Sequence, residues 1–118
     1  MLNILQLQTK VLSSKEQTLN YIEAYLKKFL HLQPDIVTLP EMFNCPYDNK
    51  SFLLYAEFEG DITYKFCQNL AKKYNIYLSA GSIPEKDAQN HLFNTAYVLI
   101  IMVIASLSIA KCIYSILM

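Results

Sequence analysis

The sequence predicts an α/β fold, because short β-forming segments alternate along the chain with segments of helical periodicity. Residues 2–8 are rich in Leu and Ile and are expected to form the first strand. Apolar residues then recur at steps of three and four over residues 15–32, which indicates an amphipathic helix. A nearly unbroken apolar run at residues 36–39 suits a strand buried on both faces. A strand, a helix and a buried strand in this order are typical of a right-handed βαβ unit.

Local signals mark where the elements begin and end. Ser14 and Gln17 form a capping box at the start of the first helix, and Pro34 follows its end. Asp61 is expected to cap a second helix, in which apolar side chains recur at i+4 steps up to Tyr74. The other expected elements are a loop with one short helix at 48–60, a third strand at 76–82, a charged hairpin loop at 85–90 and a fourth strand at 92–99.

The composition favours a globular protein and argues against a nucleic-acid partner. The 118 residues are 53% hydrophobic, and ten acidic residues balance ten basic ones, so no attraction to polyanions is expected. The three cysteines form no CxxC pair and no zinc spacing, and we expect neither a metal nor a cofactor. Because the cysteine count is odd and no signal peptide is recognisable at the amino terminus, we expect a cytoplasmic protein.

Glu41 is the strongest candidate for a functional residue. Pro40 has no N–H group to offer a neighbouring strand, so the strand at 36–39 should end there and place Glu41 at its carboxyl end. Open α/β folds bind their ligands at this edge of the sheet. Partial burial at this edge would suit Glu41 to the role of a general base. A solvated loop glutamate is the alternative, and spacing alone leaves both open.

The residues around Glu41 resemble a known family. The run Leu39-Pro-Glu41-Met-Phe-Asn44-Cys-Pro-Tyr47 is similar to the catalytic-glutamate segment of the carbon–nitrogen hydrolase (nitrilase) superfamily, and its Phe-Asn-Cys-Pro-Tyr part resembles the ω-amidase-like branch. Three flanking segments resemble the family's first, third and fourth strands in the same order, namely residues 3–8, 76–85 and 93–98. The resemblance covers residues 1–99, a partial domain, and leaves 100–118 as an apolar tail that does not match the family.

The resemblance implies the first part of an αββα sandwich and the hydrolysis of a small amide, with ω-amides of dicarboxylic acids as the expected substrate class. In the family a cysteine thiol attacks the amide carbon, a glutamate acts as base and a lysine stabilises the oxyanion, and no metal takes part. Glu41 matches the glutamate. The family's lysine and cysteine segments have no match here, so we expect a truncated hydrolase that is inactive alone. The resemblance also implies homo-oligomers.

None of the three cysteines is expected to be the nucleophile. Cys45 matches a cysteine of the ω-amidase-like branch to which the resemblance assigns no nucleophilic role. Cys67 lies on the apolar side of the second expected helix and should belong to the core. Cys112 lies in a context unlike that of the family nucleophile.

Residues 98–118 are apolar, with Lys111 as the only charge. Their number reaches the roughly 20 residues that a membrane-spanning helix needs. We expect a helix over most of residues 100–117. One interpretation is therefore a non-catalytic α/β module that a single carboxyl-terminal span tethers to a membrane, and an unrelated apolar terminus is another.

A shifted reading frame explains this tail better than a membrane anchor. If codons 100–118 are read from their third bases, the pair Met102-Val103 forces a glycine nine positions after Asn94, where the family has a hairpin glycine. The shifted codons around Lys111 also permit a Lys-Met-His-Ile-Phe run, which resembles the family's lysine segment. We therefore expect a frameshift, either in the gene or from sequencing, and disfavour a membrane partner.

Overall fold

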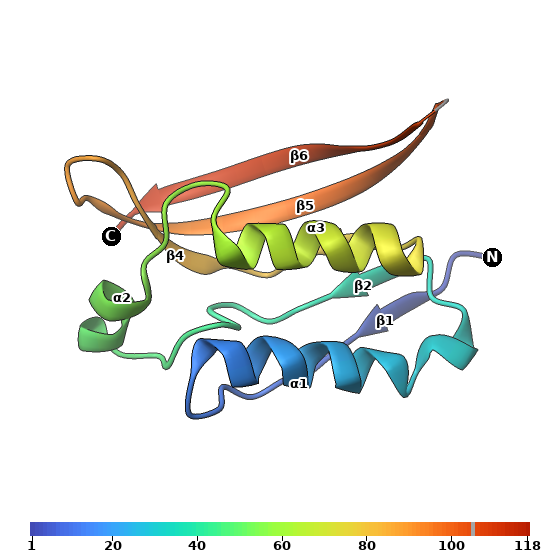
Figure 1. Cartoon of the computed structure of the whole chain (residues 1–118), viewed down its shortest axis with the longest axis horizontal. Coiled ribbons are helices and arrows are strands. Elements are labelled where there is room, and N and C mark those ends of the chain that lie inside the picture. The colour runs from blue at the N-terminus through green and yellow to red at the C-terminus, as the bar shows by residue number, and fades with distance from the viewer. Residues whose placement is uncertain (105) are drawn as a thin grey trace.

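The computed structural model describes the backbone of every residue except residue 105, and the side chains of residues 1–100 and 118. This described part of the chain contains three α-helices, one short 3₁₀ turn and six strands, and Figure 1 shows how they are arranged. In chain order they are β1 (Ile4–Gln6), α1 (Lys15–Lys27), η1 (Leu30–Leu32), β2 (Ile36–Thr38), α2 (Asn49–Tyr55), α3 (Ile62–Tyr74), β3 (Tyr77–Ser79), β4 (Ile83–Lys86), β5 (Leu92–Ile104) and β6 (Ser106–Leu117).

The strands form one mixed sheet. β2 pairs in parallel with β1 on one side and with β3 on the other. β5 runs antiparallel to β3, β4 and β6. The order is β1-β2-β3-β5-β4, with β6 paired to β5. Helices α1 and α3 connect the parallel strands, so the predicted α/β class is confirmed.

Both long helices begin with the caps that the sequence predicts. Ser14 Oγ accepts a hydrogen bond from the Gln17 N–H at 3.1 Å, and Asp61 Oδ1 accepts one from the Ile62 N–H at 2.9 Å. These bonds satisfy backbone donors that the first turn of a helix leaves without partners. They fix where α1 and α3 start relative to the strands before them.

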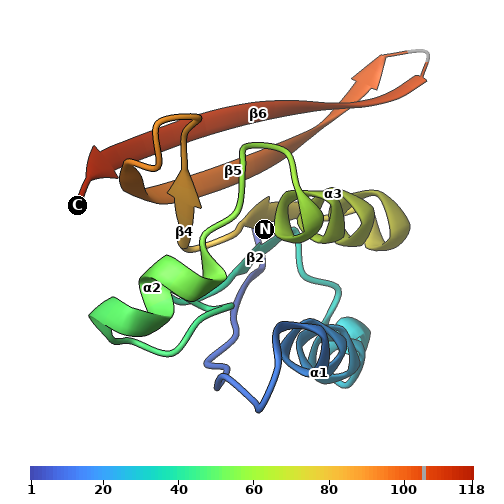
Figure 2. The ribbon, with the colours of Figure 1, turned by 60° about the vertical axis from the view of Figure 1, so that its left-hand side comes forward.

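The core lies between the sheet and the helices α1 and α3, which cover the same face (Figure 2). Leu5, Val37, Leu78 and Leu99 lie opposite one another across β1, β2, β3 and β5. The last three of these side chains are fully buried. The buried apolar side chains of the helices belong to the same cluster, among them Leu19, Ile22, Leu26, Cys67, Leu70 and Ala71.

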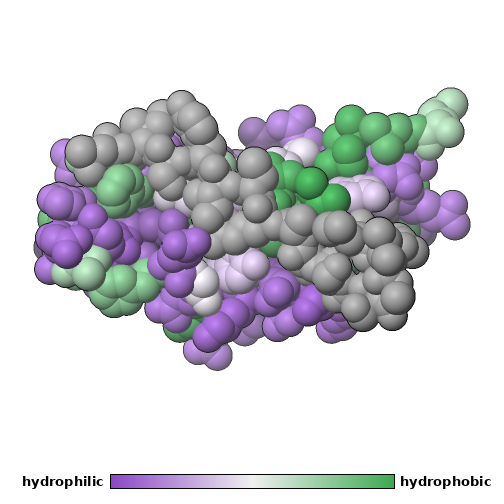
Figure 3. Space-filling view, turned by 90° about the horizontal axis from the view of Figure 1, so that it is seen from above, coloured by the Kyte–Doolittle hydropathy of each residue, from purple (hydrophilic) through white to green (hydrophobic). Residues whose placement is uncertain are grey.

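The opposite face of the sheet is apolar and open in the described structure. Ile4 and Tyr77 lie in the alternate rows of the sheet and are 63% and 40% exposed, and Ile100 is 41% exposed. In the view of Figure 3, apolar residues (green) gather in the middle and at the upper right. A sheet with one face covered by helices and one open apolar face is what the first part of an αββα sandwich would present.

Several expected boundaries differ from the structure, among them that of the third strand, which ends at Ser79 rather than at residue 82. The first helix ends at Lys27 rather than at residue 32, and the following residues form the 3₁₀ turn η1, after which Gln33 adopts a left-handed conformation (φ 53°). Residues 85–90 were expected to be a charged loop, whereas the strand β4 extends to Lys86. β4 is at an edge of the sheet, where the missing N–H of Pro84 costs no hydrogen bond of the ladder.

The helix expected over residues 100–117 was wrong. β5 continues to Ile104, and β6 pairs with it in antiparallel register from Ile104 opposite Ser106 to Phe93 opposite Leu117. This segment is rich in Ile and Val, whose branched side chains favour strands, and a hairpin pairs its backbone groups over its whole length. Among the described residues, no helix combines the length and apolar character needed to cross a membrane.

Candidate active site

Glu41 follows β2 at the carboxyl end of the parallel part of the sheet, as the sequence predicts. The Leu39 N–H donates to the Ser79 carbonyl at 2.9 Å, so the pairing of β2 and β3 continues up to the residue before Pro40. Gly81 then passes against this segment, where an added Cβ would lie 1.9 Å from the Pro40 carbonyl oxygen. Only a residue without a side chain permits this approach. The small residues after β3 thus bring a second backbone against the Glu41 segment.

Ser82 holds the turn that carries Glu41. The Met42 N–H donates to Ser82 Oγ at 3.1 Å, and the Phe43 N–H donates to the Ser82 carbonyl at 3.3 Å. Met42 adopts a left-handed conformation with φ 51°, which is uncommon for a residue with a side chain. The two bonds to Ser82 hold the backbone in this sharp reversal, and Met42 and Phe43 are both buried.

The Glu41 side chain itself points to the surface. It is exposed, so the partial burial that would suit a general base is not found in the described structure. Asn94 Nδ2, in β5, donates a hydrogen bond to Glu41 Oε1 at 3.0 Å. In the described part of the chain, Oε2 accepts no hydrogen bond. The carboxylate is therefore oriented by one amide and keeps an oxygen available to a reactant.

An open pocket of about 390 Å³ lies beside Glu41. Its lining is mostly apolar, as is usual for small-molecule sites with a few convergent polar groups. Residues from the β1–α1 loop and from the Glu41 turn line it, namely Thr9, Val11, Leu12, Pro40, Glu41, Met42, Phe43, Cys45, Pro46 and Tyr47. The pocket places Glu41 where a small substrate could reach its carboxylate.

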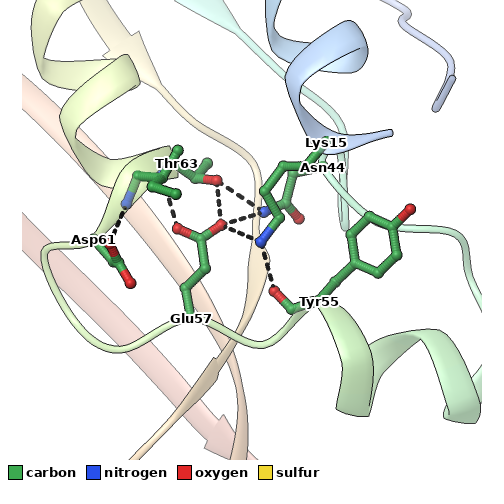
Figure 4. Close-up of polar contacts among 7 residues, drawn as sticks. Lys15, Asn44, Tyr55, Glu57, Asp61 and Thr63 are labelled. Carbon is green, nitrogen blue, oxygen red and sulfur yellow. Dashed lines mark hydrogen bonds and ion pairs between the residues drawn. The ribbon is translucent and has the colours of Figure 1, made fainter. Parts of the chain in front are cut away.

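A buried polar cluster lies behind this turn, and sequence reasoning missed it. Glu57 is only 5% exposed, although it follows helix α2 in a segment that was expected to be loop. Its carboxylate accepts hydrogen bonds from Asn44 Nδ2 at 3.1 Å, from the Thr63 N–H at 2.8 Å and from the Thr63 hydroxyl. Lys15 Nζ lies 2.8 Å from the same carboxylate and also donates to the Tyr55 carbonyl (Figure 4).

Cys45 lies four residues after Glu41 but is a poor nucleophile. It is 1% exposed, and burial together with the nearby charge of Asp48 raises the pKa of its thiol to about 11. Cys67 is fully buried in the core, as predicted, and burial raises the pKa of its thiol as well. The side chain of Cys112 lies outside the described residues. Neither described cysteine therefore supplies a reactive thiolate next to Glu41.

We predict that Cys45 in the folded chain reacts slowly with iodoacetamide at pH 8. A thiol with a pKa of about 11 is about 100-fold less ionised there than one with the ordinary value of 9.0. Its modification rate should rise in step with pH up to that pKa. Peptide mass spectrometry follows Cys45 separately from the other cysteines, and the urea-unfolded chain is the control. Equal rates for Cys45 in the folded and unfolded chain would contradict this account.

The described residues contain no group of three His, Cys, Asp or Glu side chains that could hold a metal ion. The chemical groups that converge near Glu41 are instead an oriented carboxylate, a side-chain amide and an apolar pocket wall. Such a set can position a small polar substrate and exchange a proton with it.

Comparison with known proteins identifies the family to which this chain belongs. The carbon-nitrogen hydrolase family matches residues 2–101. The chain therefore belongs to the carbon–nitrogen hydrolase family. It is similar to Omega-amidase NIT2 of Bos taurus, with 42% identity over 93 residues, which are 78% of this chain and 33% of that protein. The chain thus spans about a third of the length of the curated relatives that it matches.

Solved structures agree with this assignment. Nit3 of Saccharomyces cerevisiae, a member of branch 10 of the nitrilase superfamily, has a TM-score of 0.75 and 30% identity, over 82% of this chain and 39% of that one. A carbon-nitrogen hydrolase from Helicobacter pylori G27 has a TM-score of 0.78 and 26% identity, over 97% of this chain and 39% of that one. The expected nitrilase-type fold and the resemblance to ω-amidases are confirmed.

Proposed function

We propose that this chain is the amino-terminal part of an ω-amidase-type hydrolase and that Glu41 is its general base. The substrate class is the ω-amide of a small dicarboxylic acid. The observation that carries the proposal is the placement of Glu41 beside an open pocket at the carboxyl end of β2, where Asn94 orients its carboxylate. The name of the Bos taurus relative supports the choice of substrate class.

In this reaction Glu41 first takes the proton of a cysteine thiol that attacks the amide carbon, and it then gives that proton to the amide nitrogen, so that the C–N bond breaks and ammonia leaves. The carboxylate is thereby restored, and it takes a proton from the water that hydrolyses the acyl-enzyme. The resemblance places the thiol and the oxyanion-stabilising lysine in segments that have no match in these 118 residues. We therefore propose that the chain is truncated relative to the active enzyme. The cytoplasmic location and the homo-oligomeric assembly belong to the same proposal, for the full-length enzyme.

We predict that the purified 118-residue chain releases no ammonia above background from an ω-amide of a dicarboxylic acid. The physical reason is that a carboxylate alone provides a base but neither a nucleophile nor oxyanion stabilisation. A coupled ammonia assay measures this. Turnover that disappears in Glu41→Gln but survives replacement of Cys45, Cys67 and Cys112 would contradict both the mechanism and the truncation.

The proposal also includes the origin of the apolar tail, which we attribute to a shift of the reading frame. The glycine of the shifted frame, nine positions after Asn94, falls close to the end of β5 at Ile104. We therefore propose that residues 1–99 are family sequence and that residues 100–118 are read in another frame. The nucleotide sequence beyond codon 98 decides this: an intact shifted frame that continues into a cysteine segment supports the proposal, and stops in every frame contradict it.

A further inference from the structure

Side chains or backbone groups of Lys15, Asn44 and Thr63, from three other segments, meet at the carboxylate of Glu57, and Lys15 also binds the Tyr55 carbonyl. Lys15 is the first residue of α1, Tyr55 is the last residue of α2, and Thr63 lies in the first turn of α3. Asn44 belongs to the turn that carries Glu41. Figure 4 shows the side chains of Lys15, Asn44 and Thr63 converging on Glu57. One carboxylate thus ties the starts of two helices to the Glu41 turn.

Both oxygens of Glu57 are engaged in this cluster. Oε1 accepts from the Thr63 N–H at 2.8 Å, while Oε2 accepts from Asn44 Nδ2 at 3.1 Å and faces Lys15 Nζ at 2.8 Å. Asn44 is fully buried and also donates to Thr63 Oγ1 at 3.0 Å. The backbone of Glu57 is held as well, because its N–H donates to the Pro84 carbonyl at 3.2 Å. The Glu57 carboxylate is therefore held through both of its oxygens and through the backbone of the same residue.

Stability alone explains such a cluster poorly. Removing a charge pair from water is costly, and well-packed apolar residues often stabilise a fold as much or more. What the cluster provides is a unique position for Asn44, and Asn44 lies three residues after Glu41. Because Ser82 binds the N–H groups of Met42 and Phe43, the turn is held from β3–β4 on one side and from Glu57 on the other.

We propose that Glu57 is a positioning residue, which acts through Asn44 to hold the Glu41 turn against the end of β2. This inference rests on the proposed role of Glu41 as general base, a role that requires the carboxylate to be fixed within a fraction of an ångström of its reactant. Lys15 balances the buried charge, and Thr63 orients the carboxylate toward Asn44.

The experiment uses the full 118-residue chain and two readouts by NMR. Hydrogen exchange of the Met42 and Phe43 amides reports the Glu41 turn, and that of the Leu7 amide, which donates to the Thr38 carbonyl at 3.0 Å, reports the sheet. The side-chain amide signal of Asn94 reports the position of the Glu41 carboxylate. Glu41→Gln defines the Asn94 signal that is expected when the carboxylate is lost.

In Glu57→Gln we expect exchange at Met42 and Phe43 to rise at least about tenfold more than at Leu7. The Asn94 signal should move toward that of Glu41→Gln. The matched control is Glu23→Gln, which removes a different carboxylate–lysine pair, Glu23 with Lys73 at 2.7 Å, and should leave both readouts unchanged. An equal rise at all three amides, or an unchanged Asn94 signal, would overturn the proposal.

A second pair of variants keeps the test valid if Glu57→Gln does not fold. Thr63→Ser retains the hydroxyl and should preserve exchange at Met42 and Phe43 within about twofold, whereas Thr63→Val keeps the shape and should raise it about tenfold. Equal behaviour of the two variants would also overturn the proposal. Neither readout needs a substrate, so a failure of the amidase function would leave this result standing and would be recognised separately.

Discussion

Gly81→Ala is expected to destabilise the fold by more than about 4 kcal/mol, enough to unfold most of the chain. Gly81 has φ +43°, and a Cβ there would lie 1.9 Å from the Pro40 carbonyl oxygen and 2.5 Å from that of Leu39. Both contacts are with backbone atoms that lead directly into Glu41, so they cannot be relieved without moving the candidate base. Urea unfolding followed by circular dichroism measures the loss of stability.

Gly60→Ala is the matched control for this substitution. Gly60 also has a positive φ, +80°, but an added Cβ would meet nothing within 4 Å. It should therefore show only the cost of the left-handed conformation, about 1 kcal/mol. Equal losses in the two variants would contradict the close approach of Gly81 to the Glu41 segment.

The elements that depend on neighbouring residues could be predicted from the sequence. Ser14 and Asp61 cap their helices through bonds to residues one to three positions away. Pro40 ends the pairing of β2 because of its own covalent structure. The position of Glu41 at the end of a buried strand follows from these local effects, and the structure confirms it.

The partners of Glu41 could not be predicted, because they depend on the tertiary fold. Asn94 is 53 positions away and reaches Glu41 only after β5 has paired with β3 and β4. Glu57 lies in a polar, aromatic segment that is typical of a surface loop, yet it is buried. A buried acid that is surrounded by donors from three other segments leaves no periodic signal in the sequence.

The secondary structure of residues 100–117 could not be predicted from the sequence either. Residues 100–117 are apolar without a clear period, so helix and strand could not be distinguished by pattern. Their length suggested a helix because strands seldom exceed about ten residues. Two long strands are nevertheless possible here, because β5 and β6 pair along their length and each satisfies the backbone groups of the other.

Under the proposed function, Glu41→Gln is expected to have the largest effect on catalysis in an enzyme that contains the cysteine and the lysine. A general base that acts in both halves of a reaction contributes about 10²–10⁴-fold to the rate. Glutamine keeps the shape and can still bind Asn94, but it cannot accept a proton from a thiol. The expected change is therefore a fall in kcat of about 10³-fold with little change in KM.

The most direct measurement uses a chimera in which residues 1–99 of this chain replace the aligned segment of the Bos taurus Omega-amidase NIT2, which is 42% identical. Release of ammonia from an ω-amide is compared in the chimera, its Glu41→Gln variant and its Glu23→Gln variant. We expect an active chimera that loses activity about 10³-fold with Glu41→Gln and keeps it with Glu23→Gln. A folded, active chimera that tolerates Glu41→Gln would contradict the assignment of Glu41 as the general base.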